Sequence, residues 1–372
     1  MTKKIKSYIN TNMVAVIALF AAVITSFIIK PDRAYLDYFD YRTLTTLFIS
    51  LAVVGSFKNI YFFQITARKI VSLFKTTRSA ILALVYITFI GSMIIANDMA
   101  LITFLPLGFY ILNSTKQDKY MAFVFIMQNI AANLGGMLTP FGNPQNLYLF
   151  SRFSIPSLEF MQIMFWPFLL SMFMITLCCL FIKKEKLELK DDFNQPFNKK
   201  KAMIYTILFL FTILVVFRVF SYLIGLFIVL ITLLIIDRQS LKQVDYALLF
   251  TFCAFFVFSG NVSRIEAISD VLTYLMSKST LIVGVLSCQI ISNVPSAILL
   301  SHFTENYQEL LVAVNIGGTG TLIASLASLI TFRTYIKYNK GKQLYFIKLF
   351  SLYNFGFLLI LIIFSYLLFE WS

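Results

Sequence analysis

The stretch NLGGMLTPFGNPQN, residues 133–146, interrupts an apolar segment and cannot form one continuous helix. Pro140 and Pro144 each remove a backbone amide donor, and the three glycines weaken the helix around them. A related stretch, NIGGTGT, occupies residues 315–321. Each stretch predicts a helix that is broken in its middle and then resumes.

The sequence around both stretches is strongly apolar. Of its 372 residues, 59% are hydrophobic and 13% are charged. One globular core could not shelter so many hydrophobic residues from water. About nine apolar runs recur along the chain, each close to the roughly 20 residues that a helix needs to cross a bilayer. We therefore predict an all-α polytopic membrane protein with about nine spanning helices and two re-entrant hairpins.

The two stretches belong to a longer internal repeat. Aligning the chain with itself pairs similar residues at an offset of 205 for Asp32 with Asp237, 196 for Asn97 with Asn293, and 182 for Asn133 with Asn315. Each identity is weak alone, but their fixed order indicates two related halves.

The basic residues predict how these halves lie in the membrane. Of 31 Lys and Arg residues, 24 fall in alternate loops counted from the N-terminus and 7 fall on the other side. The positive-inside rule then makes the N-terminus and the loop at 183–201 cytoplasmic, in a multi-pass protein of the cytoplasmic (inner) membrane. Because the basic residues follow the loops, the net charge of +14 does not indicate nucleic-acid binding.

An additional helix after that loop gives the halves opposite orientations. We expect a first inverted repeat in residues 1–182, a cytoplasmic linker in 183–201, and the extra helix with the second repeat in 202–372. The expected parts are a hairpin at about 79–112 with a broken helix at about 118–150, and a second hairpin at about 279–303 with a broken helix at about 306–338. Inverted repeats place paired half-sites near the bilayer midplane and permit alternating access.

Polar residues at the hairpin tips and in the broken helices are the candidate site. Unwound backbone exposes carbonyls to a cation, while the N-terminus of the following half-helix favours an anion. The candidate substrate-binding residues are Asn97, Asn143, Gln145, Asn146, Ser292, Asn293, Thr319 and Thr321. The candidate ion-coupling residues are Asp98, Asn97, Asn293, Gly135 and Gly317. No catalytic or metal-ligating residue is predicted.

Two of these roles have structural alternatives. An ionisable side chain at mid-membrane is energetically costly, so Asp98 indicates an ion or proton pathway. A carboxylate beside the start of a half-helix can also serve only as the cap of that helix. The amides of Asn143, Gln145 and Asn146 can ligate substrate or satisfy backbone groups that Pro140 and Pro144 leave free.

The residues quoted so far resemble the ion transporter superfamily, which includes divalent anion/sodium symporters, citrate-metal transporters, arsenite permeases and sodium/proton antiporters. The stretches that carry the resemblance are Asn97-Asp98, TPFGNPQNL at 139–147, SNVPS at 292–296, and NIGG at 315–318 with SLASL at 325–329. The resemblance implies a homodimer whose hairpin tips bind substrate and coupling ions. The well-known carboxylate carriers look like Ser-Asn-Thr at both tips, and the Thr is absent here.

We therefore expect a secondary transporter for a small anion, a carboxylate or an oxyanion such as arsenite, coupled to H+ or Na+ by elevator-type alternating access and without another cofactor. A sodium/proton antiporter of the same superfamily is the alternative, and a passive channel or an intramembrane enzyme is more remote. The single histidine, His302, cannot form a two-histidine zinc motif.

Overall fold

Long apolar runs, separated by caps, prolines and positive-φ residues, give an almost entirely helical chain. The computed structural model describes residues 13–186 and 198–371, and within these ranges an isolated bridge between Thr76 and Lys186 is the one β contact. The loop at 187–197 and the basic N-terminal residues lie outside the described residues.

The helices of the first half are α2 (Met13–Ile28), η1 (Arg33–Tyr38), α3 (Tyr41–Asn59), α4 (Phe62–Ser72), α5 (Thr77–Ile95), α6 (Asn97–Ser114), η2 (Asp118–Tyr120), α7 (Met121–Gly135), η3 (Gly136–Leu138), α8 (Pro144–Arg152) and α9 (Ser157–Leu180). Those of the second are α10 (Lys199–Val216), α11 (Tyr222–Ile236), α12 (Arg238–Leu241), α13 (Tyr246–Ser263), α14 (Glu266–Lys278), α15 (Thr280–Ile291), α16 (Asn293–Leu300), α17 (Tyr307–Ile316), α18 (Leu326–Tyr338) and α19 (Gln343–Glu370).

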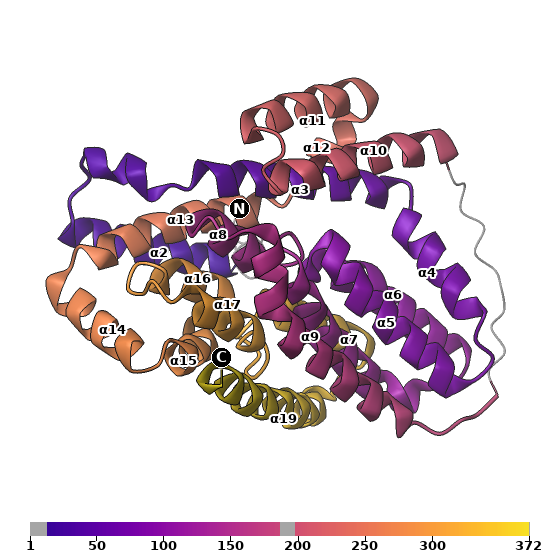
Figure 1. The fold of residues 1–372 in the computed structure, drawn as a ribbon. Coiled ribbons are helices and arrows are strands. Elements are labelled where there is room, and N and C mark those ends of the chain that lie inside the picture. Colours follow the sequence, from indigo (N-terminus) through magenta and orange to yellow (C-terminus); the bar gives the residue numbers. More distant parts are fainter. Residues whose placement is uncertain (1–12, 187–197, 372) are drawn as a thin grey trace.

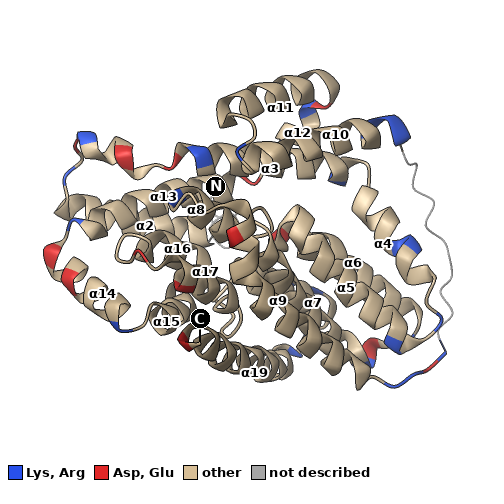
Figure 2. Cartoon of the chain, viewed as in Figure 1, with Lys and Arg blue, Asp and Glu red and all other residues tan. Residues whose placement is uncertain are grey.

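The prediction of a polytopic helical membrane protein is confirmed. Five helical segments of the described chain are long and apolar enough to cross a membrane, and the pair α3 and α4, bent by 62°, is a sixth if it is counted as one span. Three shorter apolar helices, within α2, α11 and α15, accompany them. In Figure 2 the long bodies of α5, α7, α9 and α19 are almost free of charged residues.

Both expected hairpins are pairs of packed helices joined by a single residue. Ala96 separates α5 from α6 with φ 65°, and Ser292 separates α15 from α16 with φ 77°. Positive φ is uncommon for residues other than glycine, and it turns the chain back sharply here. The two tips thus have the same backbone geometry at equivalent positions.

Both expected broken helices are also broken. The first runs as α7 and η3, unwinds over residues 139–143, and resumes as α8 with Pro144 in its first turn, where a missing amide donor costs nothing. The second ends as α17 at Ile316 and resumes as α18 at Leu326.

Contacts between the halves repeat in equivalent pairs. Arg264 donates to Asp32 at 2.6 Å and Asn59 donates to Asp237 at 3.0 Å, and both pairs are related by the same 205-residue offset. In parallel, α2 packs against α13 and α11 packs against α3. Each half therefore contributes to the other's packing in the same way.

The helices form two groups that meet at the centre of the molecule (Figure 1). We call α2, α3, α10, α11 and α13 the frame, and α5–α9 with α15–α19 the core. In Figure 1, α10 and α11 lie along α3, and the core helices α5, α6, α7 and α9 lie together on the right. The amphipathic helices α4 and α14 connect frame to core in the two halves.

Candidate functional site

Each hairpin tip is bonded to the unwound loop of a broken helix. The amide of Asn97 donates to the carbonyl of Gly142 at 3.1 Å, and the amide of Asn293 donates to the carbonyl of Ala324 at 2.9 Å. The N-termini of α6, α8, α16 and α18 consequently meet at one place. Because each N-terminus carries about half a positive charge, their meeting point favours a negative group.

Two buried asparagines tie the halves together beneath the tips. The Oδ1 atom of Asn133 accepts from Asn97 at 3.1 Å and from Ser325 of the other half at 2.8 Å. The Oδ1 atom of Asn315 accepts from Asn143 at 3.0 Å. Asn133 and Asn315 are equivalent in the repeat, so the halves exchange equivalent hydrogen bonds. Both asparagines align in the repeat but were not among the predicted site residues, although a polar residue paired across the repeats was the available signal.

In each unwound loop, a side-chain amide donates hydrogen bonds to the exposed backbone carbonyls. In the first loop, Asn146 donates to the carbonyls of Gly136, Met137 and Thr139, each at 3.2 Å. This is the structural alternative considered for Asn146, and its side chain lines neither cavity described below.

In the second loop Gln289, which was not among the predicted site residues, bonds the backbone in the same way. Its Nε2 atom donates to the carbonyls of Gly317 at 2.9 Å and Thr319 at 3.1 Å, and its Oε1 atom accepts from the amide of Thr321 at 2.9 Å. Thr319 is fully buried and donates to Ile316, and Thr321 donates to the carbonyl of Gln289. Both threonines therefore stabilise the loop and line neither cavity.

Gly135 has a packing role. A β-carbon placed there would lie 2.2 Å from the carbonyl oxygen of Phe89, so the absence of a side chain lets α7 approach the backbone of α5. This close approach explains why position 135 must lack a side chain, whether or not the carbonyl of Gly135 binds an ion.

A small cavity lies between the two tips, and we call it the tip cavity. Its walls include five predicted residues together with Ser325, and Thr251 and Phe255 of α13 close its frame side. The five predicted residues are Asn97, Asp98, Gln145, Ser292 and Asn293. The Oε1 atom of Gln145 is buried and has no partner among the described residues, so it is available to a ligand donor.

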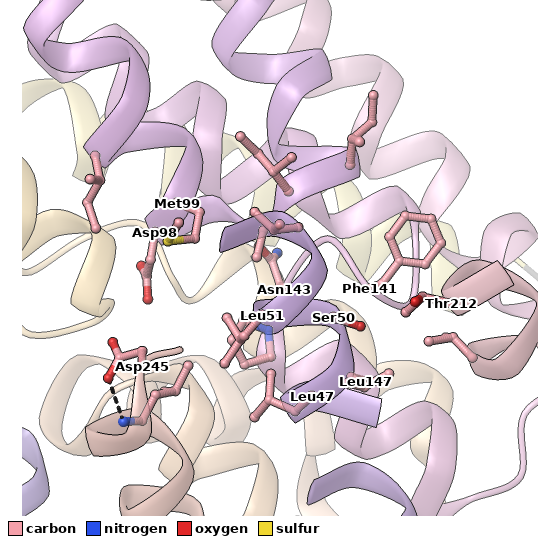
Figure 3. Close-up of a pocket in the computed structure, with 18 of the residues that line it drawn as sticks. Leu47, Ser50, Leu51, Asp98, Met99, Phe141, Asn143, Leu147, Thr212 and Asp245 are labelled. Carbon is pink, nitrogen blue, oxygen red and sulfur yellow. Dashed lines mark hydrogen bonds between the residues drawn. The ribbon is translucent and has the colours of Figure 1, made fainter. Parts of the chain in front are cut away.

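A second, more apolar cavity adjoins the first through Asp98, and we call it the inner cavity. It lies between α6 and α18 of the core and α3 and α10 of the frame, and it includes the predicted residue Asn143. Figure 3 shows Asp98 and Asp245 facing each other across it, with Phe141 and Thr212 at the far side. Among the described residues that line the two cavities, only Asp98 and Asp245 carry a charge.

Asp98 is not a hydrogen-bonded cap of α6. The cap position is Ala96, and the Oδ1 atom that bonds the amide of Asp98 belongs to Asn97, at 2.8 Å. The Oδ1 atom of Asp98 itself is buried and has no partner in the described part of the chain. Since a buried carboxylate oxygen without a donor is costly, a proton or a cation would stabilise it.

Comparison with known proteins places these features in context. A family described as Citrate transporter matches residues 1–310. A protein named as an uncharacterized transporter from Methanocaldococcus jannaschii is 35% identical over 307 residues, which cover 82% of this chain and 84% of that protein. The inner membrane protein YbiR of Escherichia coli is 28% identical over 301 residues, covering 79% of this chain and 80% of that protein.

Proposed function

This chain belongs to the citrate transporter family, and we propose that it is a secondary active transporter for a small anion, either a carboxylate or an inorganic oxyanion such as arsenite. The family and the name of the Methanocaldococcus jannaschii relative indicate a transporter rather than an enzyme. The observation that carries the proposal is the tip cavity, where four half-helix N-termini from two related halves meet.

We propose alternating access because the core contacts the frame asymmetrically. The main contacts between the groups are α16 with α13 and α8 with α3, besides a smaller one between α3 and α5. Their repeat equivalents, α6 with α3 and α18 with α13, form no comparable packing in the described chain. The inner cavity occupies the place where α6 would meet α3. Two related halves in unequal arrangements are what a carrier with two access states requires.

In the proposed orientation, the structure is open toward the cytoplasm. The helices α8 and α16 run from the centre toward the side with few basic residues, whereas α6 and α18 run toward the side rich in them. The packed pairs then close the outer side, and the inner cavity opens on the other. In the outward-open state we expect α6 to pack against α3 and α16 to leave α13.

Paired cysteines test this exchange. Ser259 donates to the carbonyl of Ile298 at 3.0 Å, and the equivalent residues Val54 and Ile102 both line the inner cavity. In a background without the four native cysteines, Ser259→Cys with Ile298→Cys should crosslink in the present state. Val54→Cys with Ile102→Cys should crosslink only in the other state. Both crosslinks should stop transport until they are reduced. If the second pair never crosslinks, the alternating-access proposal is wrong.

Coupling to H+ or Na+ is proposed for an electrostatic reason. An anion at the tip cavity lies next to Asp98, and two like charges 4 Å apart repel by about 4 kcal/mol at an effective dielectric of 20. Protonation or a bound Na+ at Asp98 removes this repulsion.

The same carboxylate favours a second candidate, a sodium/proton antiporter. Two experiments on vesicles separate the candidates. An anion carrier shows counterflow of labelled anion, while an antiporter moves protons when only Na+ or Li+ is supplied. Proton flux driven by Na+ alone would replace the anion transporter with the antiporter.

A further inference from the structure

The turn between α10 and α11 holds an arginine in a conformation that glycine usually adopts. Arg218 has φ 65°, immediately after the C-cap of α10. Its amide donates to the carbonyl of Val215 at 3.0 Å, and the next amide, of Val219, donates to Leu214 at 2.9 Å. Helices that end this way usually carry glycine at this position because other residues are strained there. Backbone strain is retained where the side chain has a use that offsets it.

The guanidinium of Arg218 reaches the last turn of α8. It donates through Nη2 to the carbonyl of Phe150 and lies 4.4 Å from the centre of the Phe150 ring. The amides that would normally reach this carbonyl, of Phe153 and Ser154, donate instead to Leu149 and Ser151. Arg218 therefore supplies a donor to a carbonyl that the helix leaves free, and a cation at a helix C-terminus also complements its dipole.

This contact joins the frame to the core on the outer side. Arg218 belongs to the frame, between α10 and α11, and Phe150 belongs to α8, which packs against α3. The nearby carboxylate of Asp40 already accepts from the amide and hydroxyl of Thr43, at 2.9 and 2.7 Å, as the cap of α3. The contact must break when α8 moves away from α3.

We propose that Arg218 is a latch that holds the core against the frame on the outer side and so favours the inward-open state. The inference rests on the alternating access proposed above. The latch belongs to one state only: position 218 lies in the turn after the additional helix α10, and its repeat equivalent is Met13, which has no guanidinium. Loss of the latch should shift the equilibrium toward the outward-open state.

The experiment measures labelling of single cysteines by a membrane-impermeant thiol reagent in cells and in inside-out vesicles, without the native cysteines. Ser259→Cys, at a position now buried beneath α16, reports outer opening, and Val54→Cys in the inner cavity reports inner opening. Arg218→Gln removes the guanidinium and keeps the strain, whereas Arg218→Gly removes both, so misfolding cannot explain a result that the two share. Arg42→Gln is the control, because Arg42 lies 5.8 Å from the ring of Tyr222 within the frame.

We expect both Arg218 variants to increase the labelling rate of the outer reporter, at position 259, relative to that of the inner reporter, at position 54, about tenfold. The loss of one charge-assisted hydrogen bond implies a change of this size. The control should label like the unchanged protein.

Labelling rates in both Arg218 variants equal to those of the control would overturn the latch. If that occurs while the crosslink between positions 54 and 102 still forms, alternating access stands without the latch. If that crosslink forms in no variant, the proposed function and the latch fail together.

Discussion

Asp98 is the residue on which coupling depends in the proposed mechanism. It lies in the first turn of α6 and lines both cavities, and its buried Oδ1 atom has no partner among the described residues. Asn97 already bonds the amide of Asp98, so the fold does not need the carboxylate as a cap.

We therefore expect Asp98→Asn to fold normally but to lose accumulation driven by a pH or Na+ gradient while retaining exchange. Proteoliposome uptake and exchange of the same labelled anion measure the two activities. Asp40→Asn is the matched control, since Asp40 lines neither cavity and Asn can still cap α3 by accepting from the amide of Thr43. Normal accumulation by Asp98→Asn would move the coupling to other groups of the tips.

The buried side chain of Asn133 contributes to the stability of the fold. Its replacement by alanine would leave buried donors of Asn97 and Ser325 without their acceptor. We expect Asn133→Ala to lower the free energy of unfolding by about 2 to 6 kcal/mol, since each of the two buried unsatisfied groups costs about 1 to 3 kcal/mol. Thermal unfolding in detergent measures it. The exposed Asn113, which donates to Asp118 at 3.3 Å, provides a control whose change to alanine should alter stability by less than about 0.5 kcal/mol.

The absence of a side chain at Gly135 lets helix α7 pack closely against α5. A methyl group there would meet the Phe89 carbonyl at 2.2 Å, so the two helices must separate. We expect Gly135→Ala to destabilise the protein by about 1 to 3 kcal/mol or more. Gly356→Ala in α19, where nothing lies within 4 Å, should be neutral or slightly stabilising, because alanine is the better helix former. Equal unfolding temperatures for the two variants would contradict the close packing.

The base of the first hairpin is closed by Glu185, on the side that is cytoplasmic in the proposed orientation. Its carboxylate accepts from Lys119 at 2.9 Å and from Gln117 at 2.8 Å, and its carbonyl accepts from the amide of Thr77 at 2.9 Å. The hydrogen bonds from Lys119 and Gln117 hold the pKa of Glu185 below its ordinary value. A carboxylate with a lowered pKa stabilises the fold above its unfolded pKa of about 4.3, and this contribution is lost as the pH falls through the lower folded value.

Hydrogen exchange should detect this change as lower protection of the Thr77 amide when the pH drops from 7 to below 4. Glu185→Gln should have the lower protection at both pH values and little pH dependence. Equal protection in the unchanged protein at both pH values would show that the carboxylate contacts of Glu185 do not hold its backbone against Thr77.

The whole molecule presents two related halves whose contacts with each other repeat in equivalent pairs, whereas the contacts between frame and core within each half do not repeat. The orientation decides which side the present state opens to. We expect Lys278→Cys, before the second hairpin, to be labelled by an impermeant reagent on intact cells, and Lys340→Cys, after α18, only after permeabilisation. Both residues are exposed. The reverse pattern would make the present state open to the outside.

The sequence by itself determined the properties that depend on local chemistry and composition. Apolar runs of spanning length set the polytopic helical class, and Pro140, Pro144 and the glycines set the breaks, because these residues act on their own backbone wherever the chain goes. Asn97, Asp98, Gln145, Ser292 and Asn293 line one cavity, and their roles in binding and coupling stay predictions.

Only the tertiary structure decided which polar groups satisfy one another. Asn143 meets Asn315 across 172 residues and Ser325 meets Asn133 across 192, and such pairings depend on how distant segments pack, which no local propensity specifies. For the same reason Asn146 and Thr319, selected for their type, turned inward to support the loops. The contact of Arg218 with α8 likewise exists only because frame and core meet there.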